Sequence, residues 1–181
     1  IDEETDRLNR LVGNLLDMSR LQTGVLQMVT RAVGWEEVVA AAAASIGIAP
    51  LEQLVVDVPE TLPPIAADPA LLERSVANVV ANALRHGAGA PVELRAWAGE
   101  GVVELAIVDH GPGVPADQHE RLFEPFQRLG DTGGTGVGLG LAVAYGFVTA
   151  MHGSIETGET PGGGLTVRIS LPVADAPGSA P

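Results

Sequence analysis

Apolar residues recur at helical spacing in the first part of the chain. Leu8, Leu11, Leu15 and Met18 are separated by three or four positions, a spacing that puts side chains on one face of an α-helix. We therefore predict a helix over residues 2–22. The stripe suits either a helix packed on its own domain or one helix of a bundle whose other members lie elsewhere.

Further helices and short apolar strands alternate along the rest of the chain. Asp68 and Pro69 suit the N-cap and first turn of a helix. The pattern predicts helices over residues 35–49, 68–86 and 142–151, and strands over residues 26–33, 54–58, 92–98, 102–109, 154–157 and 165–171. Hairpin-like pairs make the predicted sheet mixed. We therefore expect an α+β fold, a two-layer α/β sandwich with about five strands on three helices.

Composition narrows the classes of partner. The chain has 181 residues, 46% of them hydrophobic, and a formal net charge of −13. Such an acidic surface argues against nucleic acid or direct membrane contact. Every basic residue is arginine and cysteine is absent, so any cationic contact to phosphate must come from Arg. The chain begins at Ile1 rather than Met, and we expect it to be a fragment.

Glycines and one carboxylate dominate residues 109–141. Asp109 follows an apolar strand and lies beside Gly111 and Gly113, and a glycine-rich turn at residues 133–140 precedes an apolar helix. Glycines before a helix let backbone N–H groups approach an anion, and the helix N-terminus favours negative charge. A carboxylate can accept a hydrogen bond from an amino group such as that of adenine. The pattern predicts a nucleotide held at both ends.

Two amides share one face of the predicted helix over residues 68–86. Asn78 and Asn82 are four positions apart, with Arg74 and His86 at further steps of four. Buried amides need partners, and oxygen ligands suit Mg²⁺ shared with phosphates. The alternative is that both Asn residues cap neighbouring loops.

These segments together resemble the nucleotide-binding boxes of sensor histidine kinases. Residues 73–86 resemble the N box, 109–113 the G1 box, 123–126 the F box, 134–140 the G2 box, and 164–172 the closing Gly/Thr strand. The resemblance implies the Bergerat ATP-binding fold, preceded by an isolated bundle helix. Residues 14–22 and 35–38 look most like the potassium-responsive (Kdp-type) bacterial sensor kinases.

The resemblance also implies roles for individual residues, with ATP and Mg²⁺ as ligands. Asn82 and Asn78 would hold the metal, and Arg85 and Arg128 would contact phosphate, so these four are the predicted catalytic residues. The remaining predicted nucleotide contacts are His86 near the ribose and phosphates, Asp109, Gly111 and Gly113 around the adenine, Thr166 in support of it, and the backbone of Gly134, Gly136, Gly138, Leu139 and Gly140 around the phosphates.

A domain organisation follows from the same resemblance. Residues 1–23 would be the second helix of a dimerisation and phosphoacceptor hairpin, 24–34 a linker and first strand, 35–173 the catalytic ATP-binding domain, and 174–181 a disordered tail. The implied activity is transfer of the ATP γ-phosphoryl group to a histidine upstream of the chain. The implied partners are the hairpin of a homodimeric parent and a response regulator. The implied location is the cytoplasmic side of a bacterial inner-membrane sensor.

Some features depart from the family pattern and leave alternatives open. None of His86, His110, His119 and His152 has the sequence context of an acceptor, so the chain alone should not phosphorylate itself. Arg74 stands where Glu or Gln is common, which disfavours a Bergerat-fold ATPase, and residues 114–132 would form a short lid. A degenerate nucleotide-binding module without transfer is a further alternative. A Rossmann dehydrogenase is the weakest reading, because Leu141 stands where its third glycine belongs.

Overall fold

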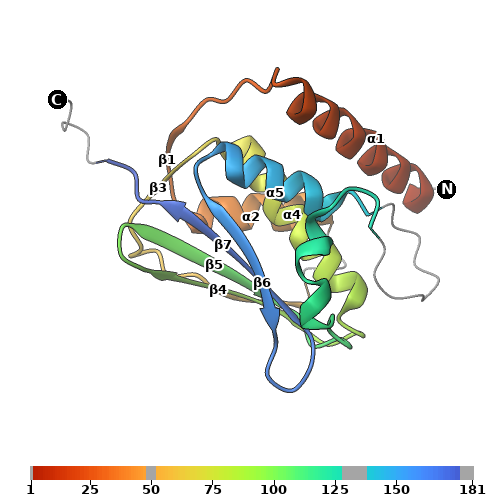
Figure 1. Ribbon diagram of the computed structural model, residues 1–181. Coiled ribbons are helices and arrows are strands. Elements are labelled where there is room, and N and C mark those ends of the chain that lie inside the picture. Colours follow the sequence, from red (N-terminus) through yellow and green to blue (C-terminus); the bar gives the residue numbers. More distant parts are fainter. Residues whose placement is uncertain (1, 48–51, 128–137, 176–181) are drawn as a thin grey trace.

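The computed structural model describes residues 2–47, 52–127 and 138–175. The helices are α1 (Asp2–Thr23), α2 (Trp35–Ile46), α4 (Pro69–His86) and α5 (Gly140–Ala150), with short 3₁₀ turns η1 (Ala116–Gln118) and η2 (Glu120–Phe123). The strands are β1 (Arg31–Val33), β2 (Leu54–Asp57), β3 (Ile65–Ala67), β4 (Val92–Ala98), β5 (Val102–Val108), β6 (Ser154–Glu159) and β7 (Leu165–Pro172). Helices α2, α4 and α5 lie on one face of a twisted sheet (Figure 1).

The main sheet has five strands in the order β2-β4-β5-β7-β6. Strand β2 runs parallel to β4, and the other neighbours are antiparallel. The predicted mixed sheet of about five strands on three helices is therefore confirmed. Val108 at the end of β5 lies opposite Thr166 in β7, so the residue after β5 lies beside the glycines that precede β7.

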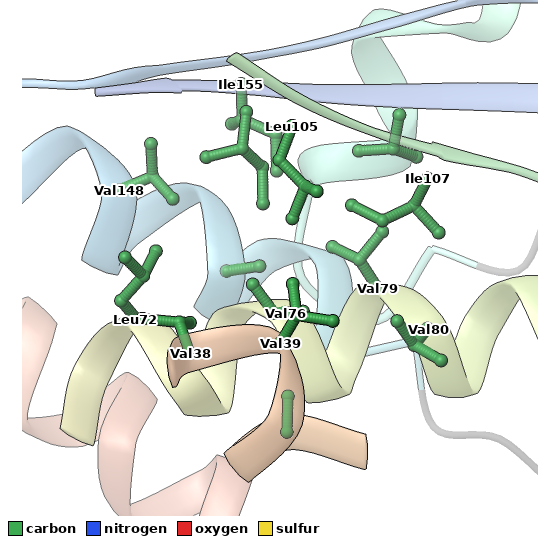
Figure 2. Close-up of a cluster of buried hydrophobic side chains, with 14 of the residues drawn as sticks. Val38, Val39, Leu72, Val76, Val79, Val80, Leu105, Ile107, Val148 and Ile155 are labelled. Carbon is green, nitrogen blue, oxygen red and sulfur yellow. The ribbon is translucent and has the colours of Figure 1, made fainter. Parts of the chain in front are cut away.

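The core lies between this sheet and the three helices. Val76 and Val79 of α4 meet Leu105 and Ile107 of β5, while α2 and α5 close the sides (Figure 2). These four side chains are at most 1% exposed, and burying a side chain of this size stabilises the fold by about 1.5–3 kcal/mol. Helix α4 is therefore held firmly against the sheet along one face.

Helix α4 begins and ends as its sequence predicts. The Oδ1 atom of Asp68 accepts hydrogen bonds from the backbone N–H groups of Ala70 (3.0 Å) and Leu71 (3.2 Å), and Pro69 occupies the first turn. The second carboxylate oxygen of Asp68 accepts from the backbone N–H of Val29 at 2.7 Å. One N-cap residue therefore also ties down the segment that leads from α1 to the domain.

A second, two-stranded sheet was not predicted. Strands β1 and β3 pair antiparallel, with Ala32 opposite Ala66. The strand expected over residues 26–33 is therefore shorter and lies outside the main sheet, and β3 was missed. Each strand has three residues, too few for a period-two pattern to stand out. Helix α2 ends at Ile46, and residues 48 and 49 of the predicted helix lie outside the described residues.

Helix α1 lies against α5 (Figure 1), so the alternative of packing on its own domain applies to part of this helix. Met18 and Leu21 pack on the core, and a Cβ atom on Gly146 would lie 2.5 Å from Leu21 Cδ1. Leu8 and Leu15 of the predicted stripe remain 59% and 51% exposed. The helix therefore meets the domain with one face and leaves much of its apolar stripe uncovered. None of the described helices has the length and apolar character that a membrane crossing requires.

Candidate functional site

Asp109 directly follows β5 and is 3% exposed. Its Oδ1 atom accepts hydrogen bonds from the backbone N–H groups of Gly111 (3.0 Å) and Leu165 (3.1 Å). Its own backbone N–H donates to the carbonyl of Leu165 at 3.0 Å. Within the described part of the chain Oδ2 makes no hydrogen bond, which leaves one oxygen of an oriented carboxylate for a ligand's amino group.

Three glycines allow the backbone to pack closely around Asp109. A Cβ atom on Gly111 would overlap the carbonyl oxygen of His86, and one on Gly164 would overlap the carbonyl oxygen of Asp109. Gly113 has φ +72°, and a Cβ atom there would lie 2.9 Å from the carbonyl oxygen of Gly164. We call these glycines, with Asp109 and Leu165, the adenine end. The hydrogen bond from Leu165 N–H was not predicted, because Leu165 lies 56 residues from Asp109 in the sequence.

Among the predicted phosphate contacts, Asn78 lies where α4 passes the start of α5. Asn78 and Asn82 are half-buried on α4, and a Cβ atom on Gly140 would lie 3.7 Å from the Oδ1 atom of Asn78. Gly138 has φ +72°, and its carbonyl accepts from the backbone N–H of Phe126 at 3.0 Å. The N–H groups at this helix start suit an anion. We call the two Asn residues, with residues 138–140, the phosphate end.

Leu139 has a different role from the glycines beside it. Its side chain is 2% exposed and lies in the interior, so only its backbone could face a ligand. Its carbonyl accepts from Val143 N–H at 2.9 Å, which begins the hydrogen bonding of α5. The buried side chain therefore anchors the start of the helix at a fixed place beside α4.

The donor set suits Mg²⁺ that is shared with a substrate. In the described part of the chain no group of three or more His, Cys, Asp or Glu side chains could hold a metal. Two amide oxygens from Asn78 and Asn82, together with phosphates and water, match the oxygen ligands and incomplete protein coordination that Mg²⁺ usually has. Asn78 and Asn82 therefore stay the predicted metal ligands.

Arg85 and His86 lie at the exposed last turn of α4. Burial lowers the pKa of His86, the positive charge of Arg85 lowers it further, and Asp109 acts in the opposite direction. The backbone of His86 lies beside Gly111, since a Cβ atom on Gly111 would overlap the His86 carbonyl oxygen. The last turn of α4 therefore lies near the adenine end.

Four other predicted residues are not brought into the site by the described structure. Arg128, Gly134 and Gly136 lie outside the described residues. Thr166 belongs to the alternating set on β7 that faces away from the helices, and its Oγ1 lies 3.0 Å from Oγ1 of Thr160. That Thr166 supports the adenine end therefore stays a prediction. The orientation of its side chain, away from the helices, does not favour it. Part of the expected lid, residues 116–123, forms η1 and η2.

A cavity of about 610 Å³ lies elsewhere, between η2, α5 and β6. Its walls include Phe123, Tyr145 and three carboxylates, Glu120, Glu124 and Glu156, but none of the predicted site residues. Three carboxylates would repel a triphosphate. The oriented Asp109 and the helix start at Gly140 are therefore better grounds for placing a nucleotide than cavity size.

Comparison with known proteins identifies the same region. Residues 67–175 match the model of the family described as histidine kinase-, DNA gyrase B-, and HSP90-like ATPase. The sensor protein KdpD of Rathayibacter rathayi is 45% identical over 170 residues, which are 93% of this chain and 20% of that protein. KdpD of Escherichia coli K12 is 35% identical over 170 residues, or 93% of this chain and 19% of that protein. The chain thus spans about a fifth of these relatives.

Solved structures agree with this match. Full-length ShkA in complex with AMPPNP has a TM-score of 0.80 and 29% identity, with 97% of this chain and 38% of that chain covered. The mycobacterial sensor histidine kinase MprB has a TM-score of 0.69 and 26% identity, with 81% and 100% covered. The likeness to ShkA extends over nearly the whole chain, and so takes in α1 as well as the sandwich.

Proposed function

This chain belongs to the family of histidine kinase-, DNA gyrase B-, and HSP90-like ATPases, as an ATP-binding catalytic domain of the sensor histidine kinase type, and we propose that it transfers the γ-phosphoryl group of Mg-ATP to a histidine outside the chain. The observation that carries the proposal is the pairing of an oriented Asp109 carboxylate with the helix start at Gly140, beside Asn78. This pairing suits a nucleotide bound at its base and at its phosphates.

Catalysis at such a site is mostly positioning and neutralisation of charge. Asp109 would fix the base through the adenine amine, and the N–H groups at the start of α5 would face the phosphates. Mg²⁺, when bound, would neutralise developing charge on the phosphates, and Asn78 and Asn82 would hold it. Arg85, and Arg128 outside the described residues, would add positive charge. These roles rest on the family resemblance and on the positions of the described residues.

The histidines of the chain support an acceptor that lies elsewhere. His119 has its Nε2 atom 2.8 Å from the Val114 carbonyl oxygen and its Nδ1 atom 3.4 Å from that of Thr157. His110 Nε2 lies 2.9 Å from a carboxylate oxygen of Glu93. His152 follows α5 with φ +61°. These three rings belong to local turns or a strand edge, and His86, on α4, belongs to the predicted nucleotide site.

Helix α1 fits the second helix of a phosphoacceptor hairpin. Its exposed apolar residues are Leu8, Val12, Leu15 and Leu16, which form a face that another helix of a homodimeric parent could cover. The parent would be a bacterial inner-membrane sensor that passes its phosphoryl group to a response regulator. The KdpD-like sequence favours a potassium-responsive system.

Arg74 favours transfer over hydrolysis by this chain. In a hydrolysing relative, a carboxylate at the position of Arg74 on this helix would activate water. Here the position holds a guanidinium, which pairs with Asp17. A guanidinium stays protonated and cannot act as a general base. An ATPase and a nucleotide-binding module without transfer are the alternatives, and the experiment below distinguishes them from a kinase.

The experiment is incubation with γ-labelled ATP and Mg²⁺, with and without a separately made hairpin that carries the acceptor histidine. We expect acid-labile label on the hairpin and none on the chain alone. Asp109→Asn should reduce labelling of the hairpin. Release of labelled phosphate without transfer would indicate an ATPase, and nucleotide binding without either product would indicate a binding module.

A further inference from the structure

Two side-chain pairs connect α1 to the N-box helix α4. Asp17 and Asn14 are three positions apart on α1, and they face Arg74 and Asn78, four positions apart on α4. Nη1 of Arg74 donates to Oδ1 of Asp17 at 2.9 Å, and Nδ2 of Asn78 donates to Oδ1 of Asn14 at 3.4 Å. The two pairs are one helical turn apart, and the order of residues shows that the helices run in opposite directions here.

The Asp17–Arg74 pair joins a buried carboxylate to a guanidinium whose side chain is 40% exposed. Nη2 of Arg74 also contacts the second oxygen of Asp17, whose side chain is 2% exposed. The guanidinium carbon lies 6.0 Å from the centre of the Phe147 ring on α5. Arg74 therefore lies where α1, α4 and α5 meet, and its hydrogen bond to Oδ1 of Asp17 links α4 to α1.

A buried carboxylate is a costly way to hold two helices together. Burial raises the pKa of Asp17, although the positive charges of Arg74 and Arg20 act against this. An apolar pair of similar volume would hold the helices without that desolvation cost. What the charged pair supplies in addition is a defined register between α1 and α4.

The second pair acts on an amide of the phosphate end. The nitrogen of Asn78 points toward Asn14 on α1, while its oxygen lies near Gly140 at the start of α5. A distance of 3.4 Å is at the long end of hydrogen bonding, so this contact orients the amide more than it binds the helix. With its nitrogen engaged by α1, Asn78 presents its oxygen toward the helix start where phosphates would bind.

We propose that Asn14 and Asp17 are positioning residues for the Mg-nucleotide site: the Asp17–Arg74 pair sets the register of α1, and Asn14 turns the Asn78 oxygen toward metal and phosphate. This inference rests on the proposed function. It makes α1 part of the nucleotide site, so that displacement of this helix weakens Mg-dependent binding. A metal ligand held by an outer partner commonly loses about 10–100-fold in affinity when that partner is removed.

The direct test is calorimetric titration of the chain with a non-hydrolysable ATP analogue, in Mg²⁺ and in EDTA. Asn14→Leu should weaken binding in Mg²⁺ by about tenfold and leave binding in EDTA unchanged. Asn14→Asp keeps an acceptor for Asn78 and should bind nearly as the unaltered chain does. Asn9→Leu is the matched control, because Asn9 is exposed on the same helix.

A double-mutant cycle tests the link between the two pairs. Asp17→Asn should also weaken binding in Mg²⁺, but should add little in a chain that already carries Asn14→Leu, because both changes act through Asn78. Fully additive losses would contradict the proposal. Equal affinity of Asn14→Leu and the unaltered chain in Mg²⁺ would overturn it while leaving the proposed function intact.

Two further outcomes separate the failures. If the unaltered chain binds no nucleotide, the proposed function fails and this inference fails with it. If Asn14→Leu weakens binding equally in Mg²⁺ and in EDTA, Asn14 supports the fold rather than the metal site, and the inference is overturned. The EDTA titration therefore keeps the test decisive even for a variant that is less stable.

Discussion

At the adenine end Asp109 is held by backbone groups of the sheet and the turn beside it, whereas at the phosphate end Asn78 lies on a helix and contacts neighbouring helices. Both hydrogen bonds to Oδ1 of Asp109 come from backbone N–H groups. Asn78 instead is oriented by a side chain from α1 and lies near the start of α5. If the proposed function holds, base recognition would depend on the backbone around β5 and β7, whereas metal and phosphate binding would respond to movement of helices.

The largest expected effect is on the backbone that supports the adenine end. Gly164 has φ +120°, and a Cβ atom there would overlap the carbonyl oxygen of Asp109. Gly164→Ala should lower the free energy of unfolding by about 3 kcal/mol, measured by chemical denaturation. Gly158→Ala is the matched control, because no atom lies within 4 Å of a Cβ added there. Equal midpoints for the two variants would contradict this account of the adenine end.

A smaller effect, confined to binding, is expected from Asp109→Asn. The amide oxygen can still accept from Gly111 and Leu165, so the fold should persist, but the amide nitrogen would then present a donor to the adenine amine. Loss of that hydrogen bond costs about 1.5–3 kcal/mol, or roughly tenfold or more in affinity. Titration with ATP and GTP measures it. Unchanged ATP affinity would remove Asp109 from base recognition.

Helix boundaries and strand pairs with strong local signals could be predicted from sequence. Asp68 and Pro69 marked the start of α4, and two short apolar segments joined by a Gly-Glu-Gly turn marked β4 and β5. The pairing of β1 with β3 could not be predicted, because it joins two three-residue segments far apart in sequence. Asp109 stood out beside two glycines, but the N–H of Leu165 that orients it depends on the register of β7.

The docking of α1 shows a different limit of sequence patterns. Hydrophobic spacing singled out Leu8, Leu11 and Leu15, yet the contact with α4 is made by Asn14 and Asp17. Polar residues on a helix usually face water, so nothing local distinguishes a pair that meets another helix. Their partners lie 64 and 57 residues further along the chain, respectively. Only the fold could bring them together.

The phosphate end can be tested through Mg²⁺-dependent stabilisation. Asn82→Ala should fold normally, because Asn82 is only half-buried, but it removes a predicted metal ligand. Mg-ATP should therefore raise the melting temperature of this variant less than that of the unaltered chain. Asn9→Ala serves as the control on exposed α1. An equal shift in both variants would show that Asn82 does not hold the metal.

The smallest expected effect is a pH dependence from His86. Because its pKa is lowered by burial and by Arg85, the folded state favours the neutral ring. The stability from this preference is present above the ordinary His pKa of about 6.5 and is lost as pH falls through the lowered value. His86→Gln should therefore lose slightly less stability than the unaltered chain between pH 7 and pH 5. An equal loss of stability in the variant and the unaltered chain between pH 7 and pH 5 would show that His86 does not cause the pH dependence.

The central claim, a nucleotide held by the sheet at its base and by helices at its phosphates, is tested most directly by a crystal structure with Mg²⁺ and a non-hydrolysable ATP analogue. We expect the adenine amine within about 3 Å of Asp109 Oδ2, the phosphates at the start of α5, and the metal beside Asn78 and Asn82. A nucleotide seated instead in the cavity lined by Phe123 and Tyr145, or an adenine without contact to Asp109, would contradict it.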